Sequence, residues 1–239
     1  MSLLTCEALS KHFGGLLAVG EVSFSVDKGQ ILALIGPNGA GKSTILNLIS
    51  GFMRPESGSV LLDGKRVDGL PPHVIAAHGV RRTFQLESMF PSLSVMDNLR
   101  LGALHASGPS ADLPELCELI GLSAYEPKLA RELPYGLRRR LAVGIALAGN
   151  PTLLLLDEPA AGLNFIESME LVELIRAVRE AGVTIVLIEH DMAVVSRAAD
   201  EVVVVDHGRV IATGNPAEVL SDKTVVEVYL GQWFQADAL

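Results

Sequence analysis

The chain has 239 residues, with 19 Lys and Arg against 28 Asp and Glu, which gives a formal net charge of −9. This length allows one large domain with a sizeable core, and the acidic balance argues against a dominant nucleic-acid surface. No apolar run is long enough for a membrane span, and we expect no secretory signal. Cys6 and Cys117 have neither metal-ligand spacing nor a disulfide pattern, so we expect a reducing cytosol.

The first elements predict a small antiparallel layer. Short strand patterns cover Leu3–Ala8 and Val22–Val26, and a third covers Ser59–Leu62 before a turn at Asp63-Gly64. The apolar run Ile31–Ile35 predicts a buried strand beside this layer.

A phosphate-binding loop follows that strand. The pattern is G-x-x-x-x-G-K-S-T, and the next residues have helical spacing. Backbone N–H groups at a helix N-terminus and the helix dipole favour an anion there. The lysine can reach the outer phosphates and the serine hydroxyl can bind Mg²⁺. An ordinary glycine-rich turn is the alternative. The predicted nucleotide-binding residues are Gly36, Pro37, Asn38, Gly39, Ala40, Gly41, Lys42, Ser43 and Thr44.

Residues 94–149 are predicted to be mostly helical, with a loop by composition at 105–110. This block includes the basic run Arg138–Arg140. For that run a solvated helix face is a simpler interpretation than a specific anion site.

A second strand, Leu153–Leu156, ends in the carboxylates Asp157 and Glu158. Ligands of parallel sheets bind beyond the carboxyl ends of strands. We therefore expect Asp157 to hold Mg²⁺, directly or through water, and Glu158 to act on the attacking water. A helix N-cap before Pro159 is the alternative interpretation.

Strands and helices then alternate to the C-terminal part of the chain. The pattern predicts a parallel α/β core with the helical block inserted between its halves. The expected elements are helix Ile166–Ala181, strand Val183–Ile188, helix Met192–Ala199 and strand Val202–Val205.

Four further motifs occur in the order typical of one family, namely residues 82–85, 133–138, 160–164 and 188–191. With them, the chain resembles the ATP-binding subunit of an ABC transporter over essentially its whole length. The resemblance implies an α/β P-loop NTPase core of mainly parallel sheet, with an antiparallel β layer and an inserted helical subdomain. It implies one ATPase domain over 1–239, in which 1–85 and 150–239 form the core and β layer and about 86–149 form the helical subdomain.

The same resemblance assigns roles to residues. It implies ATP and Mg²⁺ as cofactors, Ser43, Gln85 and Asp157 as metal ligands, and Glu158, His190 and Gln85 as catalytic residues. Gly136 would present the signature helix to the nucleotide of an opposing subunit. Phe13 would stack on adenine, with a buried strand phenylalanine as the alternative.

Several details resemble the ATPases of branched-chain amino-acid importers, including Phe13–Leu16, Ile188–Met192 and Val228–Gly231. This implies membrane permease subunits and a second identical or related ATPase subunit as partners, and a periplasmic-type solute-binding protein indirectly. It implies a peripheral location at the cytoplasmic face of the cell membrane.

The signature departs from the family pattern L-S-G-G-Q, since Pro134 replaces the serine and Leu137 the glutamine. Loss of the amide should weaken closure of the dimer without abolishing it. Pro134 and Leu137 motivate one alternative, a nucleotide-binding regulatory module, and a non-transport ABC ATPase is a second, separate alternative. The presence of Glu158 and His190 disfavours the first, and the single acidic cassette disfavours the second.

Overall fold

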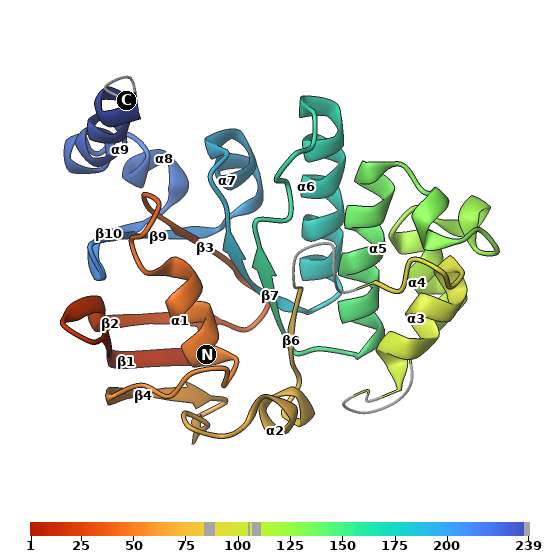
Figure 1. The fold of residues 1–239 in the computed structure, drawn as a ribbon, viewed down its shortest axis with the longest axis horizontal. Helices are drawn as coiled ribbons and strands as arrows, with labels where there is room; N and C mark the ends of the chain where they lie inside the picture. The colour runs from red at the N-terminus through yellow and green to blue at the C-terminus, as the bar shows by residue number, and fades with distance from the viewer. Residues whose placement is uncertain (84–88, 105, 107–110, 237–239) are drawn as a thin grey trace.

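The computed structural model describes residues 1–83, 89–104, 106 and 111–236. Antiparallel strands lie at one end of the molecule, and a group of three helices lies at the other (Figure 1). These helices are α3 Val95–Ala103, α4 Leu113–Leu119 and α5 Tyr135–Ala148. A mainly parallel sheet runs between the antiparallel strands and these helices.

The central sheet has six strands among the described residues, in the order β10-β9-β3-β8-β7-β6. Neighbouring strands are parallel, except that β10 runs antiparallel to β9. The predicted parallel α/β core is therefore confirmed. The strands are β3 Ile31–Ile35, β6 Val80–Arg82, β7 Leu153–Asp157, β8 Thr184–Ile188, β9 Glu201–Asp206 and β10 Arg209–Gly214.

The second sheet is antiparallel, with the strand order β2-β1-β4-β5. Its strands are β1 Ser2–Phe13, β2 Leu16–Asp27, β4 Ser57–Leu62 and β5 Lys65–Arg66. The predicted layer and its turn at Asp63-Gly64 are confirmed, but β1 and β2 are longer than the pattern indicated. Ala8 and Glu21 have positive φ angles of 45° and 56°, beside shifts in the β1–β2 register. Such irregularities interrupt the alternation of apolar and polar residues from which strand length is predicted.

Helices α6 and α7 agree with the prediction within a residue or so at each end. Strands β6 and β10 and the helices after β10 were not predicted. The helices are α1 Lys42–Ile49, α2 Pro72–Ala77, α3 Val95–Ala103, α4 Leu113–Leu119, α5 Tyr135–Ala148, α6 Phe165–Glu180, α7 Met192–Ala198, α8 Pro216–Val219 and α9 Lys223–Ala236.

Strand β7 explains how the core is divided. Leu154 and Leu156 pack in a cluster with α3 to α6, whereas Leu153 and Leu155 pack in a second cluster with α1 and the antiparallel layer. A strand covered on both faces needs apolar side chains at every position, which accounts for the run of four leucines. Since α3 to α5 share a cluster with the sheet, the proposed division of the domain near residues 86 and 149 stays a prediction.

Both cysteines are free and buried. Burial raises the pKa of the Cys6 thiol well above its usual range and the pKa of the Cys117 thiol to about 11. Both therefore stay protonated and serve as small core residues. Over the described part of the chain, we find no helix with the length and apolar character to span a membrane.

Candidate functional site

The predicted phosphate loop lies between β3 and α1. Gly36, Gly39 and Gly41 have φ angles of 149°, 79° and 106°, a region that L side chains rarely adopt. A Cβ atom on Gly36 would lie 1.9 Å from the carbonyl oxygen of Val205, and one on Gly41 would lie 2.3 Å from that of Ala18. Both backbone conformation and close packing therefore require glycine at positions 36 and 41.

Lys42 is the first residue of α1, and its ammonium group points back into the loop. Nζ donates hydrogen bonds to the carbonyl oxygens of Gly36 at 2.7 Å and Pro37 at 2.8 Å. Burial lowers the pKa of Lys42, while the nearby carboxylates of Glu158 and Asp157 act in the opposite direction. The carboxylates thus favour the charged form that binds phosphate.

A cavity of about 380 Å³ opens above this loop. Phe13 stands at the end of β1 with 47% of its surface exposed, so the alternative of a buried strand phenylalanine is wrong. The cavity brings Phe13, the phosphate loop, Glu158 and His190 together. Its lining consists of Phe13, Leu16, Leu17, Ala18, Asn38, Gly39, Ala40, Gly41, Lys42, Ser43, Thr44, Glu158, His190 and His207.

Glu158 and His190 face each other from the ends of β7 and β8. The His190 Nε2 atom lies 2.7 Å from Glu158 Oε1, and each side chain is a little over one third exposed. Glu158 has a φ angle of 49°, uncommon for a residue other than glycine. Such conformations cluster at functional sites and persist only where neighbouring contacts hold them.

The candidate metal ligands have hard oxygen donors. Ser43 is exposed to the cavity, and Asp157 Oδ2 accepts a hydrogen bond from Arg82 Nη2 at 2.8 Å. Within the described residues, no three or more His, Cys, Asp or Glu side chains gather in a group that could hold a metal. A hydroxyl and one carboxylate suit Mg²⁺, which usually keeps waters and shares phosphate oxygens. Gln85, predicted as catalytic and as a metal ligand, lies outside the described residues.

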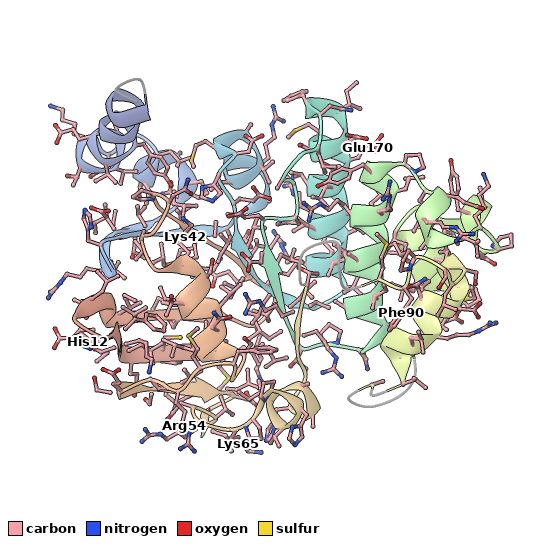
Figure 2. All side chains as sticks on the ribbon, in the orientation of Figure 1. His12, Lys42, Arg54, Lys65, Phe90 and Glu170 are labelled. Carbon is pink, nitrogen blue, oxygen red and sulfur yellow. The ribbon has the colours of Figure 1, made fainter. Side chains whose placement is uncertain are left out.

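Gly136 does not join this cavity. It is buried in the first turn of α5, where a Cβ atom would lie 2.7 Å from Glu167 Oε1. It lines a separate cavity of about 70 Å³ together with Glu170. Figure 2 shows Lys42 beside α1 and Glu170 on α6, well apart in that view. Within one chain the signature and the phosphate loop are separate.

The interpretation of Arg138–Arg140 as a solvated face is wrong, because these side chains are half-buried and bonded. Arg138 Nε donates to the Leu133 carbonyl at 2.9 Å, and Arg139 Nη2 donates to the Ala161 carbonyl at 3.0 Å. Arg140 lies 3.6 Å from Glu170. The three arginines therefore connect α5 to residues 133, 161 and 170.

Three residues at the site had no predicted role of their own. Arg82 binds Asp157, Glu189 binds the backbone beside Glu158, and Tyr135 binds the backbone of residue 161. Of the three, only Glu189 could have been found from the sequence, because a glutamate directly after an all-apolar strand is a candidate for burial. Arg82 and Tyr135 act through contacts distant in sequence.

A glycine-rich loop between a parallel strand and a helix, with carboxylates at the end of a second strand, defines a P-loop nucleotide hydrolase. The model of the ABC transporter family matches residues 19–161, and the model of the branched-chain amino acid ATP-binding cassette transporter matches residues 209–232. The chain therefore belongs to the ABC transporter family, as an ATP-hydrolysing subunit.

Similar proteins and structures agree with this assignment. The high-affinity branched-chain amino acid transport ATP-binding protein BraF of Pseudomonas aeruginosa is 38% identical, over 96% of this chain and 98% of its own. The corresponding protein LivG of Escherichia coli is 39% identical with the same coverage. A solved ATP-binding cassette of an ABC transporter in its ADP conformation has a TM-score of 0.88 and 31% identity. That match covers 97% of this chain and 99% of the other.

Proposed function

We propose that the chain binds MgATP in the cavity above the phosphate loop and hydrolyses it with Glu158 and His190. The observation that carries this proposal is the 2.7 Å contact between Glu158 Oε1 and His190 Nε2 at the wall of a cavity that Lys42 also lines. Glu158 would accept the proton of the attacking water. His190 would hold that carboxylate in place and donate a hydrogen bond to the γ-phosphate.

Phosphoryl transfer needs positioning and charge stabilisation more than covalent chemistry. Lys42 would neutralise the outer phosphates, and the loop N–H groups would bind their oxygens. Phe13 would cover the adenine ring at the mouth of the cavity. Ser43 and Asp157, with Gln85, would hold Mg²⁺, which supplies charge neutralisation on the phosphates when bound.

Glu158→Gln tests this assignment. The amide keeps the size of the side chain but cannot take up the proton, and loss of a general base costs on the order of 10²–10⁴ in rate. ATP binding should survive because Lys42 and Asp157 are intact. An ATPase rate equal to that of the wild type would remove Glu158 from the mechanism.

We propose further that the active form is a dimer in which each site takes the signature around Gly136 from the opposing subunit. Support comes from the separation of Gly136 from the phosphate loop, and from Phe165 and Ile166, which are 65% and 69% exposed just after residues 160–164. The second subunit is either an identical chain or a related one. Specific ATPase activity should then fall on dilution, and activity independent of dilution would contradict the shared site.

We infer a transport role from the similar proteins described above. We propose that the dimer binds permease subunits at the cytoplasmic face of the cell membrane, peripherally, and drives import of branched-chain or related amino acids from a periplasmic-type binding protein. The match of residues 209–232 to the branched-chain model supports the solute class. No nucleic-acid partner is proposed, since the net charge is −9. ATP-dependent uptake of labelled leucine by the complex with permeases encoded nearby tests the proposal. Uptake of another solute class alone would contradict it.

A further inference from the structure

The segment Ala160–Gly162, just after the catalytic glutamate, is bound on two sides by its own chain. On one side the Ala160 N–H donates to Glu189 Oε1 at 2.7 Å. On the other side the Ala161 carbonyl accepts a hydrogen bond from Tyr135 Oη at 2.9 Å. Two consecutive residues are thereby fixed to the end of β8 and to the start of α5.

Glu189 binds the backbone of His190 and the backbone of the segment that follows Glu158. Its other oxygen, Oε2, accepts the His190 N–H at 3.1 Å, and the side chain is only 3% exposed. One carboxylate therefore links the residue two positions after Glu158 to His190 itself. Since Glu158 has an unfavourable φ of 49°, its position depends on how this loop is held.

Glu189 does not act on the nucleotide directly. Both of its oxygens are occupied by backbone donors, and it is absent from the described residues that line the cavity. Buried carboxylates persist where hydrogen bonds compensate the lost hydration, as these N–H groups do.

The α5 side of the segment is also closely packed. Arg139, one turn after Tyr135, donates to the Tyr135 hydroxyl at 2.8 Å and to the Ala161 carbonyl at 3.0 Å. Gly162 has a φ of 80°, and a Cβ atom there would lie 3.0 Å from Tyr135 Oη. The tyrosine hydroxyl thus has both a donor and an acceptor, and it occupies the space that a side chain at residue 162 would need.

We propose that Glu189 and Tyr135 are positioning residues for ATP hydrolysis, which hold Ala160–Gly162 between them and so fix Glu158 against His190. This inference rests on the proposed function of Glu158 and His190. Tyr135 also precedes Gly136, so the same contacts connect the catalytic pair to the helix end that would face the nucleotide of the opposing subunit.

Glu189→Gln tests the first contact with little change in volume. An amide offers one acceptor oxygen, and its NH₂ group would face the second N–H donor, so one of the two bonds is lost. Because small displacements of reacting groups are costly, we expect kcat to fall roughly 10- to 100-fold. The KM for ATP should stay within about twofold, as Glu189 makes no contact with the nucleotide cavity.

Tyr135→Phe tests the second contact by removing only a hydroxyl group, and we expect the same split between kcat and KM. The double variant should lose less than the product of the two single effects, because both act through residues 160–162. Glu173→Gln on the exposed face of α6 and Tyr125→Phe in the turn Ser123–Tyr125 are matched controls that should leave kcat unchanged.

The full-length chain is assayed at a concentration where specific activity no longer depends on dilution, with melting temperatures measured in parallel. A lower melting temperature with unchanged kcat for both variants would mean that the contacts are structural only. A raised KM with intact kcat would place them in nucleotide binding, and either result overturns the inference. A wild-type chain without ATPase activity would instead contradict the proposed function.

Discussion

Arg82 Nη2 donates to Asp157 Oδ2 at 2.8 Å and joins the ends of the adjacent strands β6 and β7. The same guanidinium group donates through Nη1 to Asn47 Oδ1 at 2.6 Å, which ties it to α1. One cation therefore orients the candidate metal ligand and connects it to the helix that follows the phosphate loop. The side chains of Arg82 and Asp157 are 8% and 20% exposed.

Arg82→Ala should destabilise the fold, because it leaves the Asp157 carboxylate without its cationic partner. Breaking a fully buried pair costs about 3–5 kcal/mol, so we expect about 2–3 kcal/mol here, where one partner is partly solvated. Urea unfolding measures the change in free energy. Arg100→Ala is the control, since the exposed pair of Arg100 with Asp97 is screened by solvent and should contribute little to stability. Equal effects of both variants would contradict the structural role of Arg82.

Phe13→Ala should weaken binding of ATP and ADP. An aromatic contact contributes about 0.5–1.5 kcal/mol, which corresponds to roughly 2- to 12-fold in Kd. Affinity for tripolyphosphate, which has no base, should not change. Isothermal titration measures all three ligands, and Phe52→Ala, another exposed phenylalanine outside the cavity, is the control. Weaker tripolyphosphate binding would show that Phe13 supports the loop and not the base.

Burial raises the pKa of Glu189 above its ordinary value, although the backbone N–H groups of Ala160, His190 and Asp191 act against this effect. The folded protein therefore holds the Glu189 proton more tightly than the unfolded chain does. Its contribution to stability is present at acidic pH and is lost as the pH rises through the folded pKa.

The free energy of unfolding, measured between pH 4.5 and 7.5 for the wild type and for Glu189→Gln, checks this sign. Relative to the variant, the wild type should lose stability as the pH rises and then reach a plateau above the folded pKa. A difference that instead grows in favour of the wild type with rising pH would mean that the hydrogen bonds outweigh desolvation.

The parts of the site that the sequence predicts are those formed by neighbouring residues. The phosphate loop is one continuous segment, and strand β7 with its carboxylates is another. Pattern and spacing were therefore sufficient to locate both segments in the sequence. By contrast, Ala160 and Glu189 are 29 residues apart, and Tyr135 and Ala161 are 26 apart. Their contacts depend on how β7, β8 and α5 pack, and no local pattern contains that information.

Strand lengths show the same limit. The extent of β1 and β2 depends on backbone irregularities at Ala8 and Glu21, which break the alternation on which prediction relies. Strand β6 has only three residues and exists because β7 pairs with it. From the sequence alone, Arg138–Arg140 suggests a solvated helix face. Only the folded structure shows that the carbonyl groups of residues 133 and 161 accept hydrogen bonds from these arginines.

Leu137 departs from the glutamine of the family signature, and the structure places it half-buried against the cluster shared by α5 and α6, beside Leu163 and Leu171. Leu137→Gln should then have two separable effects. Loss of apolar packing should lower the free energy of unfolding by about 1 kcal/mol.

The second effect concerns the dimer. One added hydrogen bond in each of two sites, at about 0.5–1.5 kcal/mol each, should tighten ATP-dependent dimerisation by roughly 5- to 150-fold if the sites add. Analytical ultracentrifugation in a Glu158→Gln background measures the dimerisation constant with and without the substitution. Leu137→Met is the control, because it keeps the packing without adding an amide. Dimerisation that is unchanged or weaker in Leu137→Gln would mean that Leu137 serves packing alone and that the signature contacts phosphate through the backbone at Gly136.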